Sequence, residues 1–105
     1  MTVPSFNFDN ANDYKEALDI INKDLDLVNN RLLEAIRYGI DNYLLNVYLY
    51  EIYLKGGSSY SVKCPRIKWE EALIEAKEFF EEKEEYEKCA EIVKLIVKLN
   101  SEEYS

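Results

Sequence analysis

The chain has no histidine and, among 105 residues, only two cysteines, three glycines, two prolines and one tryptophan. The absence of histidine removes the side chain that most often serves as a general base or a metal ligand. Two cysteines alone are too few for a structural zinc site. No GxxxxGK[ST], GxGxxG or GxSxG pattern occurs, so the sequence offers neither a phosphate-binding loop nor a nucleophile elbow. We therefore expect a protein that is not an enzyme and uses no cofactor and no metal.

Basic residues are also scarce, since 13 Lys and Arg stand against 21 Asp and Glu, giving a net charge of −8. This balance disfavours nucleic acids and anionic membranes as direct partners, because both attract clustered Lys and Arg. No apolar run approaches the roughly 20 residues of a membrane span, and the first ten residues lack the pattern of a signal peptide. We expect a cytoplasmic protein with reduced cysteines. Frequent Asn, Lys, Ile, Tyr and Phe, which have AT-rich codons, are compatible with a phage protein found in host cytoplasm or in a virion.

The apolar pattern predicts helices over most of the chain. In residues 9–38, apolar side chains recur at alternating spacings of four and three, which indicates a helix packed at a shallow angle. Asp9 or Asn10 can cap its start, and Gly39 can end it in the left-handed conformation. We therefore predict one long helix over 9–38.

Residues 68–82 and 85–100 predict a helical hairpin. The first half has one apolar face, made of Trp69, Leu73, Ala76, Phe79 and Phe80. The second half has another, made of Cys89, Ala90, Val93, Ile96 and Val97. On one straight helix these faces would lie about 140° apart, so we place a turn near 83–85. The pair resembles one tetratricopeptide-type hairpin at its apolar and small positions, which are Leu73, Ala76, Phe80, Tyr86 and Cys89. No second copy of that repeat occurs, so we assign no family.

The segment 42–55 is ambiguous between a helix and a strand. It is rich in Tyr and apolar on both sides, which suits either a helix or a buried strand. As a strand it would form a hairpin over about 46–64, with Gly56 and Gly57 at the turn. We favour the helix, because a lone two-stranded hairpin is only marginally stable. The prediction is a single all-α domain over 1–105, a small four-helix bundle with an extended arm at 1–8 and a loop at 56–66; the alternative is α+β with the small hairpin.

Three surfaces are candidates for binding a partner. The first is a tyrosine face on the predicted helix, made of Tyr43, Asn46, Tyr50 and Tyr53, because Tyr is enriched at interfaces. The second is an acidic row of Glu71, Glu75, Glu78 and Glu82, within a run at 70–91 that holds ten glutamates and three lysines. The third is the arm, in which Phe6 and Phe8 either pack on the domain's own core or dock on a neighbouring subunit.

A small basic patch surrounds the single tryptophan. Lys63, Arg66 and Lys68 precede Trp69, so cations and an indole ring could hold an anionic ligand or stack a base. Cys64 has basic neighbours, which can lower a thiol's pKa and make it a nucleophile. The alternatives are that Trp69 anchors its helix in the core and that Cys64 is an ordinary loop residue, and we expect these.

The leading hypothesis is a small acidic protein–protein interaction protein that self-associates or belongs to a larger assembly. One alternative is an acidic inhibitor of the anti-defence type, in which carboxylates mimic the phosphates of a nucleic acid and block a basic groove of a nucleic-acid-binding protein. A second alternative is a minor component of a phage particle. All three require a protein partner or a second copy of the chain.

Overall fold

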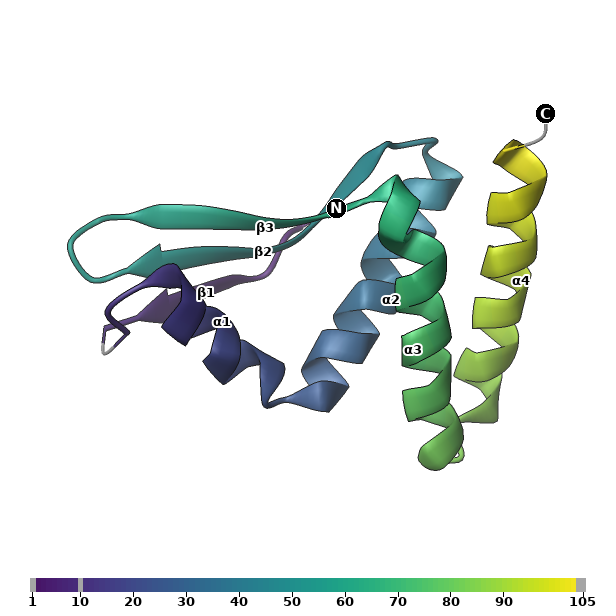
Figure 1. The fold of residues 1–105 in the computed structure, drawn as a ribbon, viewed down its shortest axis with the longest axis horizontal. Coiled ribbons are helices and arrows are strands. Elements are labelled where there is room, and N and C mark those ends of the chain that lie inside the picture. The colour runs from purple at the N-terminus through teal and green to yellow at the C-terminus, as the bar shows by residue number, and fades with distance from the viewer. Residues whose placement is uncertain (1, 10, 104–105) are drawn as a thin grey trace.

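The fold is α+β, so the predicted all-α helical bundle is wrong. The computed structural model describes residues 2–9 and 11–103, with side chains described through residue 101. Within these residues a mixed sheet of three strands lies beside four α-helices (Figure 1). In chain order the elements are β1 (Ser5–Phe8), α1 (Tyr14–Asn22), α2 (Leu25–Asp41), β2 (Asn46–Leu54), β3 (Ser59–Pro65), a 3₁₀ turn (Arg66–Lys68), α3 (Trp69–Glu82) and α4 (Tyr86–Glu103).

The segment predicted as a helix at 42–55 is strand β2, and the predicted loop at 56–66 contains strand β3. The two strands pair antiparallel, from Asn46 opposite Pro65 to Tyr53 opposite Ser59. Gly56 and Gly57 form the turn between them with φ of 95° and 92°, a left-handed conformation that suits glycine. The alternative reading, a hairpin over about 46–64, therefore fits the structure.

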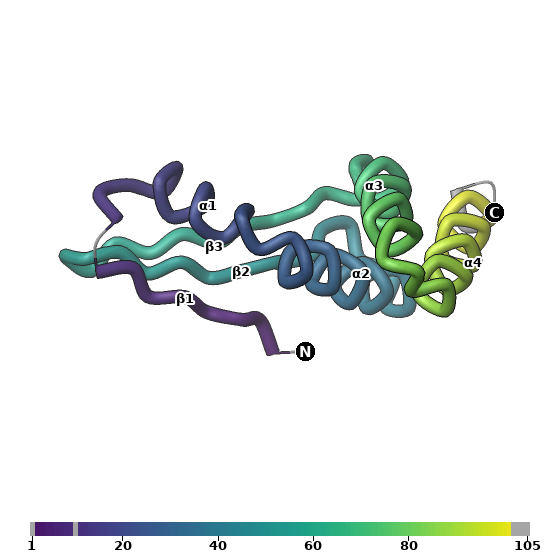
Figure 2. Tube along the Cα trace, turned by 90° about the horizontal axis from the view of Figure 1, so that it is seen from below, coloured from purple at the N-terminus to yellow at the C-terminus, as the bar shows by residue number. Residues whose placement is uncertain are grey.

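The hairpin is stable because the N-terminal arm adds a third strand and α1 covers one face. β1 pairs parallel to β2, with Ser5 opposite Glu51 and Phe8 opposite Leu54. α1 and α2 form the connection between these parallel strands, and α1 lies against the sheet (Figures 1 and 2). A lone two-stranded hairpin is only marginally stable, but here β1 and α1 pack against it and supply the contacts that it would otherwise lack.

The predicted long helix at 9–38 is divided into α1 and α2 at Lys23 and Asp24. The Asp24 side chain accepts a hydrogen bond from the Leu27 backbone N–H at 3.1 Å and so caps α2. Asp13 caps α1 by accepting from the Glu16 N–H at 2.9 Å, so the predicted cap at Asp9 is wrong, while Asn10 lies outside the described residues. The break lets α1 cover the sheet while α2 continues into the layer of helices (Figure 1).

The helical hairpin at 68–82 and 85–100 is present as α3 and α4, with the turn at 83–85 as predicted. Glu84 has φ of 61°, its N–H bonds to the Glu81 carbonyl, and the Glu85 N–H bonds to the Phe80 carbonyl at 2.9 Å. This is a Schellman helix end with glutamate where glycine is usual. The absence of glycine therefore did not prevent the turn.

The buried face of α4 differs from the predicted one. Cys89, Ile92, Leu95 and Leu99 are buried, whereas Ala90, Val93 and Val97 are exposed. The core-facing side is rotated because α4 packs against α2 as well as α3. Ion pairs also join α2 to α4: Arg37 with Glu91 at 2.5 Å and Lys98 with Asp41 at 3.0 Å.

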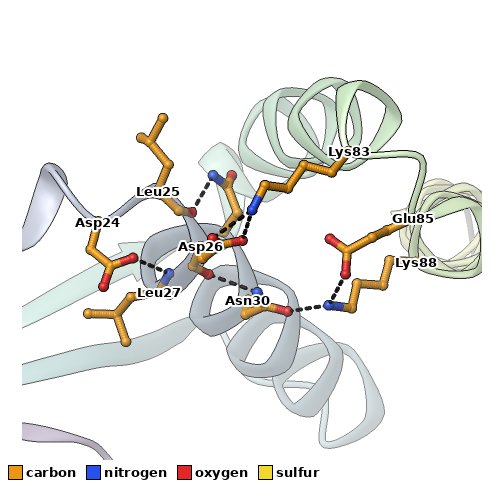
Figure 3. A network of polar contacts seen from close by, with 9 residues as sticks. Asp24, Leu25, Asp26, Leu27, Asn30, Lys83, Glu85 and Lys88 are labelled. Carbon is orange, nitrogen blue, oxygen red and sulfur yellow. Dashed lines mark hydrogen bonds and ion pairs between the residues drawn. The ribbon is translucent and has the colours of Figure 1, made fainter.

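The start of α2 is tied to the α3–α4 turn by a polar network (Figure 3). Lys83 Nζ lies 2.5 and 2.6 Å from the two carboxylate oxygens of Asp26. Lys88 Nζ donates to Asn30 Oδ1 at 2.9 Å and to Glu85 at 3.1 Å. Part of the charge in the run 70–91 is therefore used to hold the helices together.

The core extends from the space between α1 and the sheet, where Ala17 and Ile52 are buried, to the place where α2, α3, α4 and the base of the hairpin meet. Trp69 is fully buried, and its Nε1 donates to the Cys64 carbonyl at 2.9 Å. Gly39 lies inside α2 instead of ending it, so its predicted role as a C-cap is wrong. A Cβ atom at Gly39 would lie 2.6 Å from both Trp69 Cη2 and Val47 Cγ1. Glycine is needed there for close packing.

Candidate interaction surfaces

One face of the sheet is left uncovered by the described part of the chain. Cross-strand partners share a face, and those on the α1 side include Phe6, Ile52 and Tyr60, with Tyr60 in ring contact with Tyr14 of α1. No described helix packs on the opposite face (Figures 1 and 2). We call this surface the open face; it consists of Ser5, Asn7, Tyr48, Glu51, Tyr53, Ser59, Ser61 and Lys63.

A β-bulge brings the two tyrosines of the open face together. The pairing of β2 with β3 shifts between Tyr48 and Tyr50, so Leu49 is an extra residue in the ladder. Leu49 and Tyr50 are consecutive and both buried, at 9% and 2% exposure. Without the bulge, strict alternation would put Tyr48 and Tyr53 on opposite faces. With it, both lie on the open face.

Cross-strand contacts hold the open face in one arrangement. Lys63 Nζ lies 5.5 Å from the centre of the Tyr48 ring. The Ser61 hydroxyl donates to Glu51 Oε1 at 2.7 Å. Tyr48 and Tyr53 are each 44% exposed. Rings and hydroxyls held this way lose less conformational freedom when a partner binds.

Arg31 of α2 holds the bulge in place by hydrogen bonds to two of its carbonyls. Its guanidinium is buried and donates to the carbonyls of Leu49 and Tyr48, each at 2.8 Å, and to Glu34 at 3.3 Å. β1 pairs with β2 only from Glu51 onward, so Arg31 supplies donors where β1 does not pair. Burial lowers the pKa of Arg31, and the Glu34 carboxylate partly offsets this effect. Sequence analysis did not single out Arg31, since nothing in its neighbours signals a partner 17 or 18 residues away.

The predicted tyrosine face does not exist as one surface, because its segment is a bulged strand instead of a helix. Tyr43 lies in the α2–β2 connection with φ of 54° and is 74% exposed. Asn46 is the first residue of β2 and lies opposite Pro65, on the same side of the strand as Tyr48, and Tyr53 belongs to the open face. Tyr50 is buried, and its hydroxyl has no hydrogen-bond partner among the described residues. Burial raises the pKa of Tyr50.

The acidic row lies along the exposed side of α3. Glu71, Glu75, Glu78 and Glu82 are all exposed, opposite the buried Leu73. Glu71 lies 3.8 Å from Lys68 Nζ. Within the described side chains, the other three make no ion pair. The row is therefore a line of exposed carboxylates about 16 Å long, from a rise of about 1.5 Å per residue, and one of the four is paired with a lysine.

The arm packs on its own chain as β1. Phe6 lies 5.6 Å from Tyr50, centre to centre in an edge-on arrangement, and Phe8 lies 6.4 Å from Phe6. Both rings are partly buried against the core. This placement matches the first of the two alternatives for Phe6 and Phe8, and docking on a neighbouring subunit has no support in it.

The basic patch lacks the chemistry that a ligand site would need. Trp69 is fully buried and cannot stack a base, while Arg66 lies 5.1 Å from its ring and donates to the Leu44 carbonyl. Cys64 is buried, and burial raises its pKa, which opposes the thiolate that a nucleophile requires. Lys63, which the sequence placed in this basic patch, lies on the open face instead, opposite Tyr48.

The described residues offer neither a metal-ion cluster nor a membrane-spanning helix. None of their His, Cys, Asp and Glu side chains form a group of three or more that could hold a metal ion. No helix in the described part of the chain is long and apolar enough to span a membrane. No protein-family model, curated protein or solved structure matches the chain.

Proposed function

We propose that the protein is a non-enzymatic interaction protein that binds a protein partner through the open face. The observation that carries this proposal is the pair of half-exposed tyrosines, Tyr48 and Tyr53, on a sheet face that no described element covers. Tyrosine is enriched at protein interfaces because its large ring adds buried apolar area while its hydroxyl can still form a hydrogen bond with the partner or with water.

The composition of the open face suits a partner that associates and dissociates. The surface around the two rings is polar, because it is made of Glu51, Ser59, Ser61 and Lys63. It can therefore be exposed to solvent when the partner is absent. The bulge and the Arg31 hydrogen bonds fix the spacing of the rings before binding. Both features favour recognition by a preformed surface.

The test compares two faces of the same sheet. A double variant, Tyr48→Ser with Tyr53→Ser, removes the rings of the open face. Tyr60→Ser is the matched control, because Tyr60 is also 44% exposed but lies on the face toward α1. A partner captured from extracts of the source organism is purified, and its affinity for each variant is measured by calorimetry.

We expect the double variant to lose at least about 30-fold in affinity, since a tyrosine at the hot spot of an interface contributes about 2 kcal/mol or more. Tyr60→Ser should bind within about threefold of the wild type. Equal losses in both variants would point to a general loss of folding, and thermal melts of both proteins detect that. Unchanged binding by a folded double variant would refute the proposal.

A second candidate function is suggested by the exposed carboxylates of the acidic row. Four exposed glutamates in line, three of them without an ion pair among the described side chains, could stand in for the phosphates of a nucleic acid in a basic groove. Replacing Glu71, Glu75, Glu78 and Glu82 with Gln should then abolish salt-sensitive binding to a basic partner. The same substitutions should leave binding through the open face intact, which separates the two functions.

A further inference from the structure

We infer that α4 pairs antiparallel with α4 of a second copy of the chain. The inference stands on observations separate from the open face. α4 lies at the end of the molecule farthest from the sheet, and no described element covers its outer side (Figures 1 and 2).

An apolar stripe runs along this outer side. It consists of Tyr86, Ala90, Val93 and Val97, at spacings of four, three and four, all of them exposed. Val93 is 46% exposed, Val97 61% and Tyr86 64%. This spacing is the pattern by which one helix packs along another.

The stripe continues into a shallow groove between α4 and α3. Ile74 of α3, 45% exposed, lines this groove together with Val93, Ile96 and Val97. Lys77 and Glu81, which also line it, form an ion pair with each other, and Glu78 of the acidic row lies at the same groove. Apolar side chains of both helices therefore meet at the stripe, as in one half of a four-helix arrangement, with charged residues of α3 along the α3 side of the groove.

Charged residues beside the stripe identify the occupant. On the side of α4 away from α3, Glu91 and Lys98 are paired with residues of α2. Glu87 and Lys94 lie between those residues and the stripe, both exposed and without an ion pair among the described side chains. They are two helical turns apart, about 10 Å along the axis.

An antiparallel pair of α4 helices makes these charges complementary. With the twofold axis between Ala90 and Val93, Tyr86 of one copy faces Val97 of the other. Glu87 of each copy then stands beside Lys94 of its partner, so that the interface holds two opposite-charge pairs. A parallel pair would put Glu87 and Lys94 of one copy on the opposite side of the stripe from those of the other copy, so these opposite-charge pairs would not form. Ala90 beside the axis allows close approach.

The size of the surface sets the expected affinity. The stripe is about 16 Å long, and even with the groove it is smaller than the roughly 800 Å² per partner of a standard interface. Each chain also carries a net charge of −8, which adds repulsion that salt screens. We expect a reversible dimer with a Kd of about 10–100 μM at about 0.15 M salt.

The test is sedimentation of the full chain from about 5 to about 500 μM, a range that spans this Kd. Val93→Asp should abolish the dimer, whereas Ile20→Asp should not, because Ile20 on α1 has the same 46% exposure but lies outside the stripe. Glu87→Lys and Lys94→Glu should each weaken self-association at least about tenfold. A mixture of these two variants should associate at least as well as the wild type, since every pair across the heterodimer is then opposite in charge.

Two results would overturn the inference. One is a wild-type protein that stays monomeric throughout the concentration range. The other is a dimer that Val93→Asp and Ile20→Asp affect equally, or that the mixture of charge variants fails to restore. Circular dichroism confirms that each variant is folded, and because the four positions are exposed the fold should persist.

Discussion

The Arg31 guanidinium joins α2 to the bulge of β2, and its removal should destabilise the whole fold. Its hydrogen bonds to the Leu49 and Tyr48 carbonyls are both 2.8 Å long, and the side chain is 3% exposed. Replacing Arg31 with Met keeps much of the apolar stem and leaves these two carbonyls without the donors.

The magnitude follows from two opposing effects. A buried acceptor left without a donor costs about 1–3 kcal/mol. Against this, the variant no longer buries a cation, which is itself unfavourable. We expect Arg31→Met to lower the free energy of unfolding by about 2–4 kcal/mol, a large share of the about 5–15 kcal/mol that is typical of folded proteins.

Urea unfolding at pH 7, followed by far-ultraviolet circular dichroism, measures this change. Glu34→Gln is the control: Glu34 is 55% exposed and touches the same guanidinium, so its loss should cost less than about 1 kcal/mol. A variant Arg31→Met that is as stable as the wild type would show that the buried hydrogen bonds only offset the cost of burying the cation.

Three further predictions concern backbone strain, packing and titration. Glu84→Gly should raise the free energy of unfolding by about 0.5–1 kcal/mol, because glycine adopts the left-handed conformation at the α3–α4 turn without strain; a loss of stability in urea unfolding would contradict this. Gly39→Ala should lower the free energy of unfolding by about 1–3 kcal/mol despite alanine's better helix propensity, because its Cβ would clash with Trp69 and Val47. Thermal unfolding measures this change, and a variant more stable than the wild type would refute the packing account. Burial raises the pKa of Tyr50 above its ordinary value of 10.0. Above about pH 10 the unfolded state therefore loses the Tyr50 proton while the folded state keeps it. The free energy of unfolding that Tyr50 contributes is then constant below about pH 10 and falls above it. Tyr50→Phe should flatten that fall in alkaline unfolding curves, and identical curves for both proteins would exclude Tyr50 as its source.

The sequence predicted the elements whose contacts are local. The helical hairpin of α3 and α4 was found from two apolar faces that no straight helix could bury together. The acidic row was found because positions four and three apart share a face of any helix. Both inferences need only the geometry of one helix, and neither depends on distant parts of the chain.

The elements that sequence analysis missed depend on contacts between distant residues. β2 is a strand because residues 5–8 pair with it across more than 40 residues of chain, and no periodicity within 42–55 records that pairing. The bulge at Leu49 moves Tyr50 inward and joins Tyr48 with Tyr53, and a one-residue shift of this kind has no composition signal. The buried face of α4 was misplaced because its contact with α2 could not be seen from α4 alone.

The central claim is that the open face binds a protein partner, and covalent footprinting of tyrosine tests it most directly. Tyr48, Tyr53 and Tyr60 are each 44% exposed in the free protein, so they should be modified at similar rates by hydroxyl radicals. In the complex with the captured partner, we predict that Tyr48 and Tyr53 become protected while Tyr60 is modified as before. Protection of Tyr60 alone, or no protection of Tyr48 and Tyr53 in a complex shown to be saturated, would contradict the claim.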